Sequence, residues 1–339
     1  MIADLGLSKL GRADKDATYI ITTASVTLGY CDPEYYFTGI LTKGSDVYSF
    51  GVVMFEVLCG RLGFIKVDNE HRLLARLAQR YYEAGRLNEI IDPYLKIEVD
   101  SDFLKKFSEI AYPCLLSERD RRPSMSLLVQ KLEELMASSK FPIFMSSSSN
   151  SKITAFIKES KHFFIPFQVI ENATKNFTTI LGNGGYGIVY KGELLLSGEL
   201  TSVAVKRLDS KISGQGFKQF LTEIQLLSRY KHPNLVSLLG FCDEAGEKIL
   251  IYEYAEHRSL DKHLTVSKIT HPLTWERRIS ICRDTARGLD YLHNGIPTNH
   301  QVIHRDIKSA NILIGHEWKV MIADLGLSKI GHANEDDYY

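Results

Sequence analysis

The residues best suited to chemistry lie in one stretch near the C-terminal end, Val302–Ile314, which reads Val-Ile-His-Arg-Asp-Ile-Lys-Ser-Ala-Asn-Ile-Leu-Ile. A carboxylate such as Asp306 can accept or orient a hydroxyl proton, and Lys308 can neutralise a phosphate in transfer. The carboxamide oxygen of Asn311 can hold a metal ion. A chance polar loop would not reproduce all these offsets between apolar flanks. The stretch therefore predicts phosphoryl-transfer chemistry.

A second acidic group follows closely along the chain. Ten residues beyond Asn311 begins Met321–Gly326, in which an apolar strand delivers Asp324 into a glycine turn, as a Mg²⁺ ligand requires. Taken alone, Asp-Leu-Gly is more often a surface turn. Its place directly after the Asp306 stretch favours a metal site made by Asn311 and Asp324.

A glycine-rich stretch, Leu181–Tyr190, precedes both. Its Gly-x-Gly-x-x-Gly-x-Val pattern is formed by Gly182, Gly184, Gly187 and Val189. Glycines let a backbone approach phosphate oxygens closely, but the same spacing occurs in dinucleotide-binding folds and in plain turns. A dinucleotide fingerprint opens a helix, whereas this stretch continues as a strand and is followed by Val203-Ala-Val-Lys206 on the next. The context predicts a loop that covers phosphates.

Lys206 lies in a β-branched run, where a lone lysine is usually a solvent-facing residue of an amphipathic strand. Glu223 changes that interpretation, because it lies on the following helix, on the turn between Phe220 and Ile224. A buried Lys206–Glu223 pair would hold the ammonium against the phosphates of a nucleotide.

The elements that must position these residues are read from periodicity. Strands are predicted at Ile180–Glu193, Ser202–Leu208 and Lys248–Tyr254, with a turn around Ser197–Glu199 between the first two. Helices are predicted at Val47–Gly60, at Ser124–Met136, around Phe217–Leu227 and at Thr274–His293. The first part of the chain is thus mainly helical, and the second begins with strands.

Composition excludes several classes of protein. The 339 residues include 41 basic and 41 acidic ones, so charge gives no reason to expect nucleic acid or an anionic membrane as the main partner. The cysteines show no C-x-x-C spacing and predict reduced, mostly buried thiols; they are Cys31, Cys59, Cys114, Cys242 and Cys282. No apolar run is long enough to span a bilayer, and we expect this chain in the cytoplasm.

Together these motifs resemble a eukaryotic protein kinase of the plant receptor-like Ser/Thr class. The resemblance implies an α+β, two-lobed fold with a small β-rich lobe and a large helical lobe. It extends to three motifs of the first part: Thr27–Tyr35 resembles the substrate-binding loop, Ser45–Gly51 the helix that supports the catalytic loop, and Arg122–Met125 the late-lobe arginine motif. In the family, Asp46 and a Glu34–Arg122 pair brace the catalytic loop and large lobe.

The resemblance also implies the role of each candidate residue, with ATP and Mg²⁺ as cofactors and protein hydroxyls as substrates. It makes Asp306 the catalytic base, Lys308 a phosphate contact, and Asn311 and Asp324 the Mg²⁺ ligands. The ATP site would be formed by Leu181, Gly182, Gly184, Gly187, Val189, Lys206 and Glu223, with Tyr252 guarding the adenine pocket and the hinge running from Glu253 to Ala255. The Asp-Ile-Lys-Ser-Ala-Asn sequence resembles the Ser/Thr-directed form of this loop.

The order of the parts is reversed. Residues 1–137 resemble the C-terminal part of a kinase domain, residues 138–162 a Ser-rich linker, and residues 163–339 the N-terminal part. Residues 1–19 match residues 321–339 at 13 of 19 positions, and Met1–Lys9 is identical to Met321–Lys329. We therefore expect the end of one kinase followed by the start of a second, with a parent protein at the plasma membrane.

Three hypotheses follow. The first is an active kinase assembled from both parts, within one chain or by exchange between two. The second is a catalytically incomplete fragment that binds nucleotide or acts as a regulatory interaction module. The third is an unstable product without a function of its own.

Overall fold

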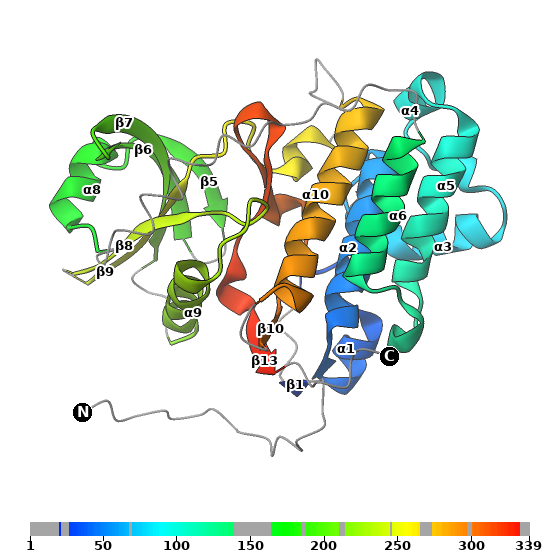
Figure 1. Cartoon of the computed structure of the whole chain (residues 1–339), viewed down its shortest axis with the longest axis horizontal. Helices are drawn as coiled ribbons and strands as arrows, with labels where there is room; N and C mark the ends of the chain where they lie inside the picture. The colour runs from blue at the N-terminus through cyan, green and yellow to red at the C-terminus, as the bar shows by residue number, and fades with distance from the viewer. Residues whose placement is uncertain are drawn as a thin grey trace.

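The computed structural model describes nine stretches of the chain: 20–21, 27–67, 70–138, 164–184, 187–209, 214–244, 246–264, 273–296 and 300–332. They form two lobes side by side, one built on a β-sheet and one on helices (Figure 1). The predicted α+β architecture is confirmed.

The small lobe is a five-stranded antiparallel sheet in the order β5-β6-β7-β9-β8. Its strands are β5 (Ile180–Gly184), β6 (Gly187–Leu196), β7 (Glu199–Leu208), β8 (Leu238–Glu244) and β9 (Glu247–Glu253). Alternate residues of β9 face opposite ways: Ile249 and Ile251 join the core under α8 (Phe167–Ala173), whereas Leu250 and Tyr252 join the main core with α9 (Gln215–Arg229). One helix therefore covers each face, and α9 lies towards the second lobe (Figure 1).

The β-structure predicted at Ile180–Glu193 is present, but it consists of two strands, β5 and β6, which pair antiparallel as far as Gly184 and Gly187. Gly187 has φ 154° and lies against β7, where a Cβ would fall 2.2 Å from the main-chain oxygen of Arg207. Only glycine fits there, so Gly187 allows the start of β6 to lie directly against β7.

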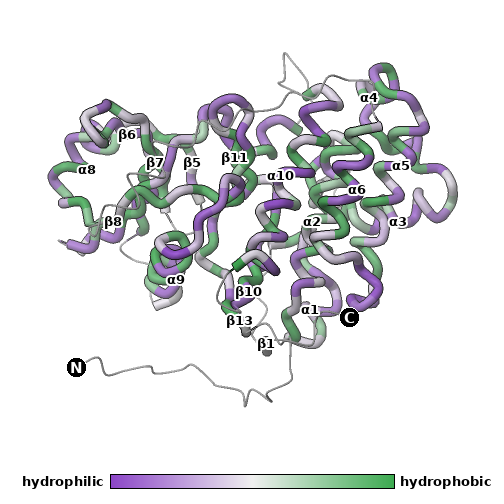
Figure 2. Tube along the Cα trace, viewed as in Figure 1, coloured by the Kyte–Doolittle hydropathy of each residue, from purple (hydrophilic) through white to green (hydrophobic). Residues whose placement is uncertain are grey.

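The helical lobe combines both parts of the chain. The first part supplies α1 (Pro33–Thr38), α2 (Lys43–Cys59), α3 (Leu74–Glu83), α4 (Pro93–Glu98), α5 (Ser101–Ala111) and α6 (Met125–Ala137), and the second supplies α10 (Trp275–Asn294). Figure 1 shows α10 beside α2 and α6, and its larger contact is with α6. The traces of α5, α6 and α10 alternate between hydrophilic and hydrophobic residues, as expected of helices that bury one face (Figure 2).

Short antiparallel pairs complete the lobe. They are β1 (Ile20–Ile21) with β2 (Ile40–Leu41), β3 (Phe64–Val67) with β4 (Glu70–Leu73), β10 (His300–Ile303) with β13 (Lys329–His332), and β11 (Ile312–Ile314) with β12 (Val320–Ile322). The last two pairs flank the catalytic-loop sequence and the Asp324 turn, and so position both.

The central helix α2 is buried on all sides from Ser45 to Cys59. It begins at Lys43, four residues before the predicted start, where the Thr42 N–H donates to the Ser45 hydroxyl at 3.3 Å and so caps the first turn. It ends where Gly60 adopts a left-handed conformation with φ 62°. The predictions of α6, α9 and α10 are confirmed, with Ser124 and Thr274 as the N-caps of α6 and α10.

One buried ion pair ties the two parts together. Arg278 of α10 donates to Asp92, which caps α4, at 2.5 Å, and also to the main-chain oxygens of Val57 at 2.6 Å and Leu273 at 2.9 Å. Its side chain is only 3% exposed. Three acceptors satisfy the guanidinium, so α10 is fixed against α2 by contacts that neither part makes alone.

No helix in the described stretches is long and apolar enough to cross a membrane. All five cysteines are free; four are buried and Cys31 is half-buried, as predicted.

Replacing Arg278 by alanine is expected to lower the free energy of unfolding by about 3 to 5 kcal/mol, because it leaves Asp92 buried and unpaired. The matched control is Arg287→Ala, also on α10, whose partner Glu133 is 43% exposed. That change is expected to cost less than about 1 kcal/mol. Urea unfolding measures both, and equal losses would contradict the buried tie.

Candidate active site

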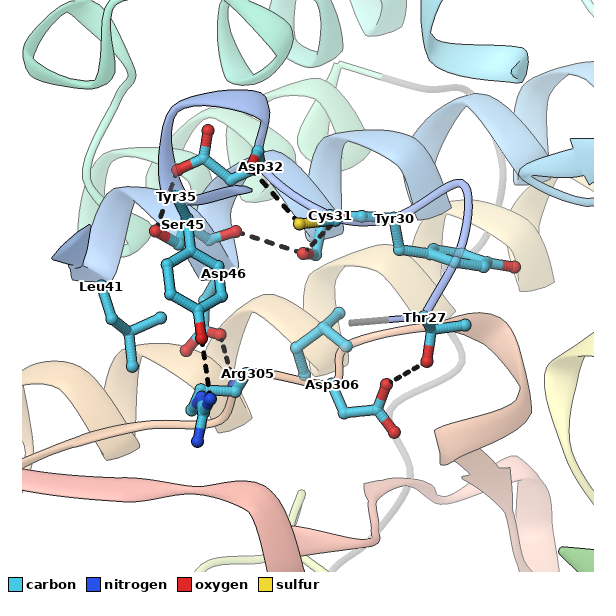
Figure 3. Close-up of a pocket in the computed structure, with 12 residues that line it drawn as sticks. Thr27, Tyr30, Cys31, Asp32, Tyr35, Leu41, Ser45, Asp46, Arg305 and Asp306 are labelled. Atoms are coloured by element: carbon cyan, nitrogen blue, oxygen red, sulfur yellow. Dashed lines mark hydrogen bonds between the residues drawn. The ribbon is translucent and has the colours of Figure 1, made fainter. Parts of the chain in front are cut away.

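The catalytic-loop residues converge between β10 and β11. Lys308 Nζ lies 2.6 Å from Asp306 Oδ2, and Asn311 Nδ2 donates to the same oxygen at 3.0 Å and to the Asp306 main-chain oxygen at 2.8 Å. From the first part of the chain, the Thr27 hydroxyl donates to Asp306 Oδ1 at 2.5 Å (Figure 3). Lys308 also reaches the Thr27 hydroxyl at 3.2 Å. One carboxylate thus organises groups from both parts.

Asp46 of α2 supports the catalytic loop through hydrogen bonds to its main chain. Its carboxylate accepts the main-chain N–H groups of His304 at 2.7 Å and Arg305 at 2.9 Å, and His293 Nε2 of α10 lies 3.0 Å away. Burial alone would raise the pKa of Asp46, but the two histidines and the Arg305 N–H hold it below its ordinary value. Arg305 has φ 71°, a conformation that costs a non-glycine residue about 1 to 3 kcal/mol. The Asp46 hydrogen bonds offset that strain.

A second charged cluster lies where the lobes meet. Lys206 Nζ of β7 is 2.8 Å from Glu223 of α9 and 2.8 Å from Asp324. Burial would lower the pKa of Lys206, but the two carboxylates raise it, so the ammonium stays charged. Burial likewise opposes ionisation of Asp324, yet Lys206 brings the pKa of Asp324 down to about 2. The predicted Lys206–Glu223 pair is present, and Lys206 forms a second ion pair with Asp324.

The Tyr252 hydroxyl of β9 donates to the other oxygen of Glu223. Burial and the neighbouring carboxylate raise the pKa of Tyr252 well above its ordinary value, so it remains a donor. Glu223, only 1% exposed, therefore has both oxygens engaged.

The geometry is compatible with a magnesium ion. The side-chain nitrogen of Asn311 donates to Asp306, which leaves the side-chain oxygen of Asn311 for a cation. Asp324 is held close to Asn311, because the N–H of the preceding residue, Ala323, donates to the Asn311 main-chain oxygen at 2.9 Å. No group of three or more His, Cys, Asp or Glu residues able to hold a metal occurs in the described stretches. Mg²⁺ needs none, since it binds through one or two protein oxygens together with waters and phosphates.

The remaining candidates border the same region. Leu181, Gly182 and Gly184 lie in β5, whereas Gly187 and Val189 lie in β6, with Val189 paired to Lys206 of β7. Glu253 ends β9 and Ala255 follows it. The Glu253 side chain accepts from the Ser237 N–H at 2.8 Å and from Lys319 at 2.8 Å, which anchors the segment that joins the lobes.

Comparison with known proteins identifies this arrangement. The family described as protein tyrosine and serine/threonine kinase matches residues 1–132 and 176–339. The chain belongs to the protein kinase family. The match falls in two stretches that cover most of the chain, and the missing stretch between them includes the Ser-rich segment.

The relatives that the chain matches are receptor-like kinases, the class that its motifs resemble. Receptor-like protein kinase HERK 1 of Arabidopsis thaliana is 47% identical over 188 residues, 55% of this chain and 22% of the relative. FERONIA, from the same plant, is 46% identical over 174 residues, 50% of this chain and 18% of its own length. Calcium/calmodulin-regulated receptor-like kinase 1, also of Arabidopsis thaliana, is 45% identical over 180 residues, which are 53% of this chain and 39% of the relative. The chain thus spans well under half of these relatives.

The predicted Glu34–Arg122 pair of the kinase is wrong. Arg122 donates to Asp32 at 2.7 Å, with both side chains fully buried, whereas Glu34, 37% exposed, lies 2.9 Å from Arg119. Asp32 also caps α1 by accepting the Glu34 N–H. An unpaired charge costs more when it is buried, so the buried carboxylate of Asp32 pairs with the buried guanidinium of Arg122. The more exposed carboxylate of Glu34 pairs with Arg119 instead.

Sequence reasoning assigned no role to Glu56, which is fully buried beneath the substrate loop. One of its oxygens accepts from the Tyr30 hydroxyl at 2.5 Å, the Gly63 N–H at 2.7 Å and the Ser309 hydroxyl at 3.2 Å. Burial raises the pKa of Glu56 to about 8, although these hydrogen bonds lower it. The available signal was the one acidic residue within the apolar run from Val47 to Cys59.

The cavity in Figure 3 lies behind the catalytic loop and is lined by Thr27, Asp46, Tyr35 and Arg305 among others. Its volume of about 10 Å³ holds no more than roughly one water. Arg305 crosses it to donate to the Tyr35 hydroxyl at 2.7 Å. The cavity is part of the junction between the two halves rather than a separate ligand site.

The Glu56 environment predicts a pH effect. Between its unfolded pKa of 4.5 and its folded pKa of about 8, the folded protein holds a proton that the unfolded chain has released, so stability falls as pH rises through this window. Glu56→Gln removes that loss. Its free energy of unfolding relative to the unmodified protein is expected to increase by about 2 to 4 kcal/mol from pH 5 to pH 8.5.

Denaturant unfolding at several pH values measures the difference, with the exposed Glu134→Gln as control. A Glu56→Gln difference that stays constant from pH 5 to pH 8.5 would contradict the raised pKa.

Proposed function

We propose that this chain is an ATP- and Mg²⁺-dependent protein serine/threonine kinase whose two halves form one active site within one chain. The observation that carries the proposal is the Asp46 carboxylate of the first half, bonded to the main chain of His304 and Arg305 in the second. The Thr27–Asp306 hydrogen bond supports it from the opposite side of the loop. Neither half contains a complete site.

The residues suit phosphoryl transfer. Asp306 is placed to accept the proton of a substrate hydroxyl, since one oxygen already accepts the Thr27 hydroxyl. Lys308 lies beside it to neutralise charge on the transferring phosphate. Lys206, fixed by Glu223, would contact the nucleotide phosphates under the glycine hairpin. Bound Mg²⁺ would neutralise phosphate oxygens, and Asn311 and Asp324 would hold it.

We infer the preference for serine or threonine from the same residues, and the cellular location from the relatives. Lys308 contacts both Asp306 and Thr27, which supports a serine- or threonine-directed loop. The relatives are named receptor-like kinases, so we place the parent of this chain at the plasma membrane, with the kinase halves on its cytoplasmic side.

The domain limits remain our proposal: residues 1–137 and 163–339 as kinase halves, joined by residues 138–162. The first half ends with α6 at Ala137, and the described residues stop at Ser138 and resume at Phe164. A stretch of about 25 residues can span roughly 80 to 90 Å when fully extended, which allows closure within one chain.

Phosphate transfer from radiolabelled ATP to a generic serine-containing protein tests the function. Asp306→Ala is expected to lower the rate by about 10² to 10⁴ because the proton acceptor is lost. Asp46→Ala is expected to be similarly inactive because the loop loses its support. Asp102→Ala, an exposed position on α5, is the control and should retain the unmodified rate.

Activity that survives Asp46→Ala would contradict assembly of the halves. Nucleotide-dependent thermal stabilisation without any transfer would instead favour the non-catalytic binding module. Mixing the Asp46→Ala and Asp306→Ala chains separates the two modes of pairing: exchange between chains restores transfer, whereas pairing within one chain leaves the mixture inactive.

A further inference from the structure

The segment that joins the two lobes, Glu253–Ser259, here called the connecting segment, lies against the β11–β12 hairpin. The His257 N–H donates to the main-chain oxygen of Ile314 at 2.9 Å, and the Ile314 N–H donates to the main-chain oxygen of Arg258 at 2.8 Å. Because Ile314 is the last residue of β11, the hairpin sets the path that the connecting segment takes as it leaves the small lobe.

The turn of this hairpin is held from two sides. The Trp318 ring stacks on the His257 ring, with centroids 4.6 Å apart and an interplanar angle of 17°. The Arg277 guanidinium of α10 lies 3.8 Å from the centroid of the same Trp318 ring. Glu317 and Trp318 have φ of 51° and 62°, conformations that non-glycine residues keep only where surrounding contacts impose them. The turn is therefore a rigid support for the connecting segment.

Lys319, the next residue, ties the connecting segment to this support. Its Nζ lies 2.8 Å from Glu253 Oε2, and the other carboxylate oxygen of Glu253 accepts the Ser237 N–H at 2.8 Å. The main chain of Glu253 pairs with Val203 of β7. The side chains of Lys319 and Glu253 are 27% and 13% exposed, so water and salt screen this ion pair only in part. Glu253 is thus bonded to the small lobe and, through Lys319, to the helical lobe.

The open end of the same hairpin carries the candidate metal ligands. Asn311 immediately precedes β11, and Asp324 lies two residues after β12. The Ala323 N–H donates to the Asn311 main-chain oxygen at 2.9 Å, which closes that end. One two-stranded unit therefore holds the connecting segment at its turn and the groups assigned to Mg²⁺ at its other end.

We propose that Lys319 is a positioning residue for nucleotide binding, which acts through Glu253 to hold the connecting segment at a fixed distance from Asn311 and Asp324. The inference rests on the proposed function, in which the adenine lies against the connecting segment and the phosphates lie at Lys206 and Mg²⁺. Lys319 sets the spacing between these two ends of the site.

The spacing matters most to a ligand that binds both ends at once. Such a ligand gains the full affinity of both contacts only when the distance between them is already set. ATP with Mg²⁺ is a ligand of this kind, whereas adenosine reaches only the connecting segment. Removal of the Lys319 charge should therefore weaken the binding of ATP and leave that of adenosine almost unchanged. Damage to the connecting segment itself would weaken both ligands to the same extent.

Calorimetric titration of the full chain with ATP and MgCl₂, and separately with adenosine, tests the inference. Lys319→Met keeps the length of the side chain and removes its charge. It is expected to raise the Kd of ATP, and the KM of ATP in transfer assays, by about three- to tenfold, because a preorganising contact is lost. The Kd of adenosine and kcat are expected to stay within about twofold, since Asp46 supports the catalytic loop independently of Lys319.

Two further variants test the charge and its partner. Lys319→Arg retains the positive charge and should bring the Kd of ATP to within about twofold of the unmodified value. Glu253→Gln keeps the shape of the side chain and should weaken ATP as Lys319→Met does, with no further loss in the double variant. Should Lys319→Met fail to fold, Glu253→Gln carries the same test. The matched control is Lys248→Met on β9, whose lysine is 29% exposed and pairs with Asp243; it should leave both Kd values unchanged.

An unchanged Kd of ATP in Lys319→Met and Glu253→Gln would overturn the inference. Equal losses for ATP and adenosine would overturn it too, as would a loss in Lys319→Arg as large as that in Lys319→Met. An unmodified chain that binds ATP but transfers no phosphate would contradict the proposed kinase activity instead, and the Kd comparison would still decide the role of Lys319. An unmodified chain that binds no ATP would contradict both.

Discussion

The buried carboxylate of Asp46 is the constraint on which the rest of the structure depends. The catalytic loop places Arg305 in a left-handed conformation and exposes two main-chain N–H groups beneath Asp306. Such groups are costly when buried without acceptors, and Asp46 satisfies both at once. Because Asp46 lies on α2, the loop geometry in the second half requires a helix from the first.

The order that we propose for the two halves is compatible with this constraint, because the halves meet through complete helices. The packing of α10 on α2 and α6, with Arg278 bonded to Asp92, is made between intact helices. The described helices of the lobe therefore pack together whatever the order of the halves along the chain.

Local patterns in the sequence predicted the elements with strong periodicity, such as α10 with its Thr274 cap and β7 with Lys206. They failed where a partner distant in sequence decides the outcome. The partner of Arg122 depends on Asp32 being more deeply buried than Glu34, and the raised pKa of Glu56 depends on complete burial in α2. The hairpin at Gly187 depends on contact with β7, which no single-strand pattern contains.

The most direct test of assembly within one chain is a crosslink between the halves. Ser126 of α6 lies 2.6 Å from Asp290 of α10, near the surface. Cysteines placed at both positions and treated with a short bis-maleimide in dilute solution should give a crosslinked monomer that joins the two segments. Crosslinked dimers, or two unjoined cysteines in folded protein, would contradict the account.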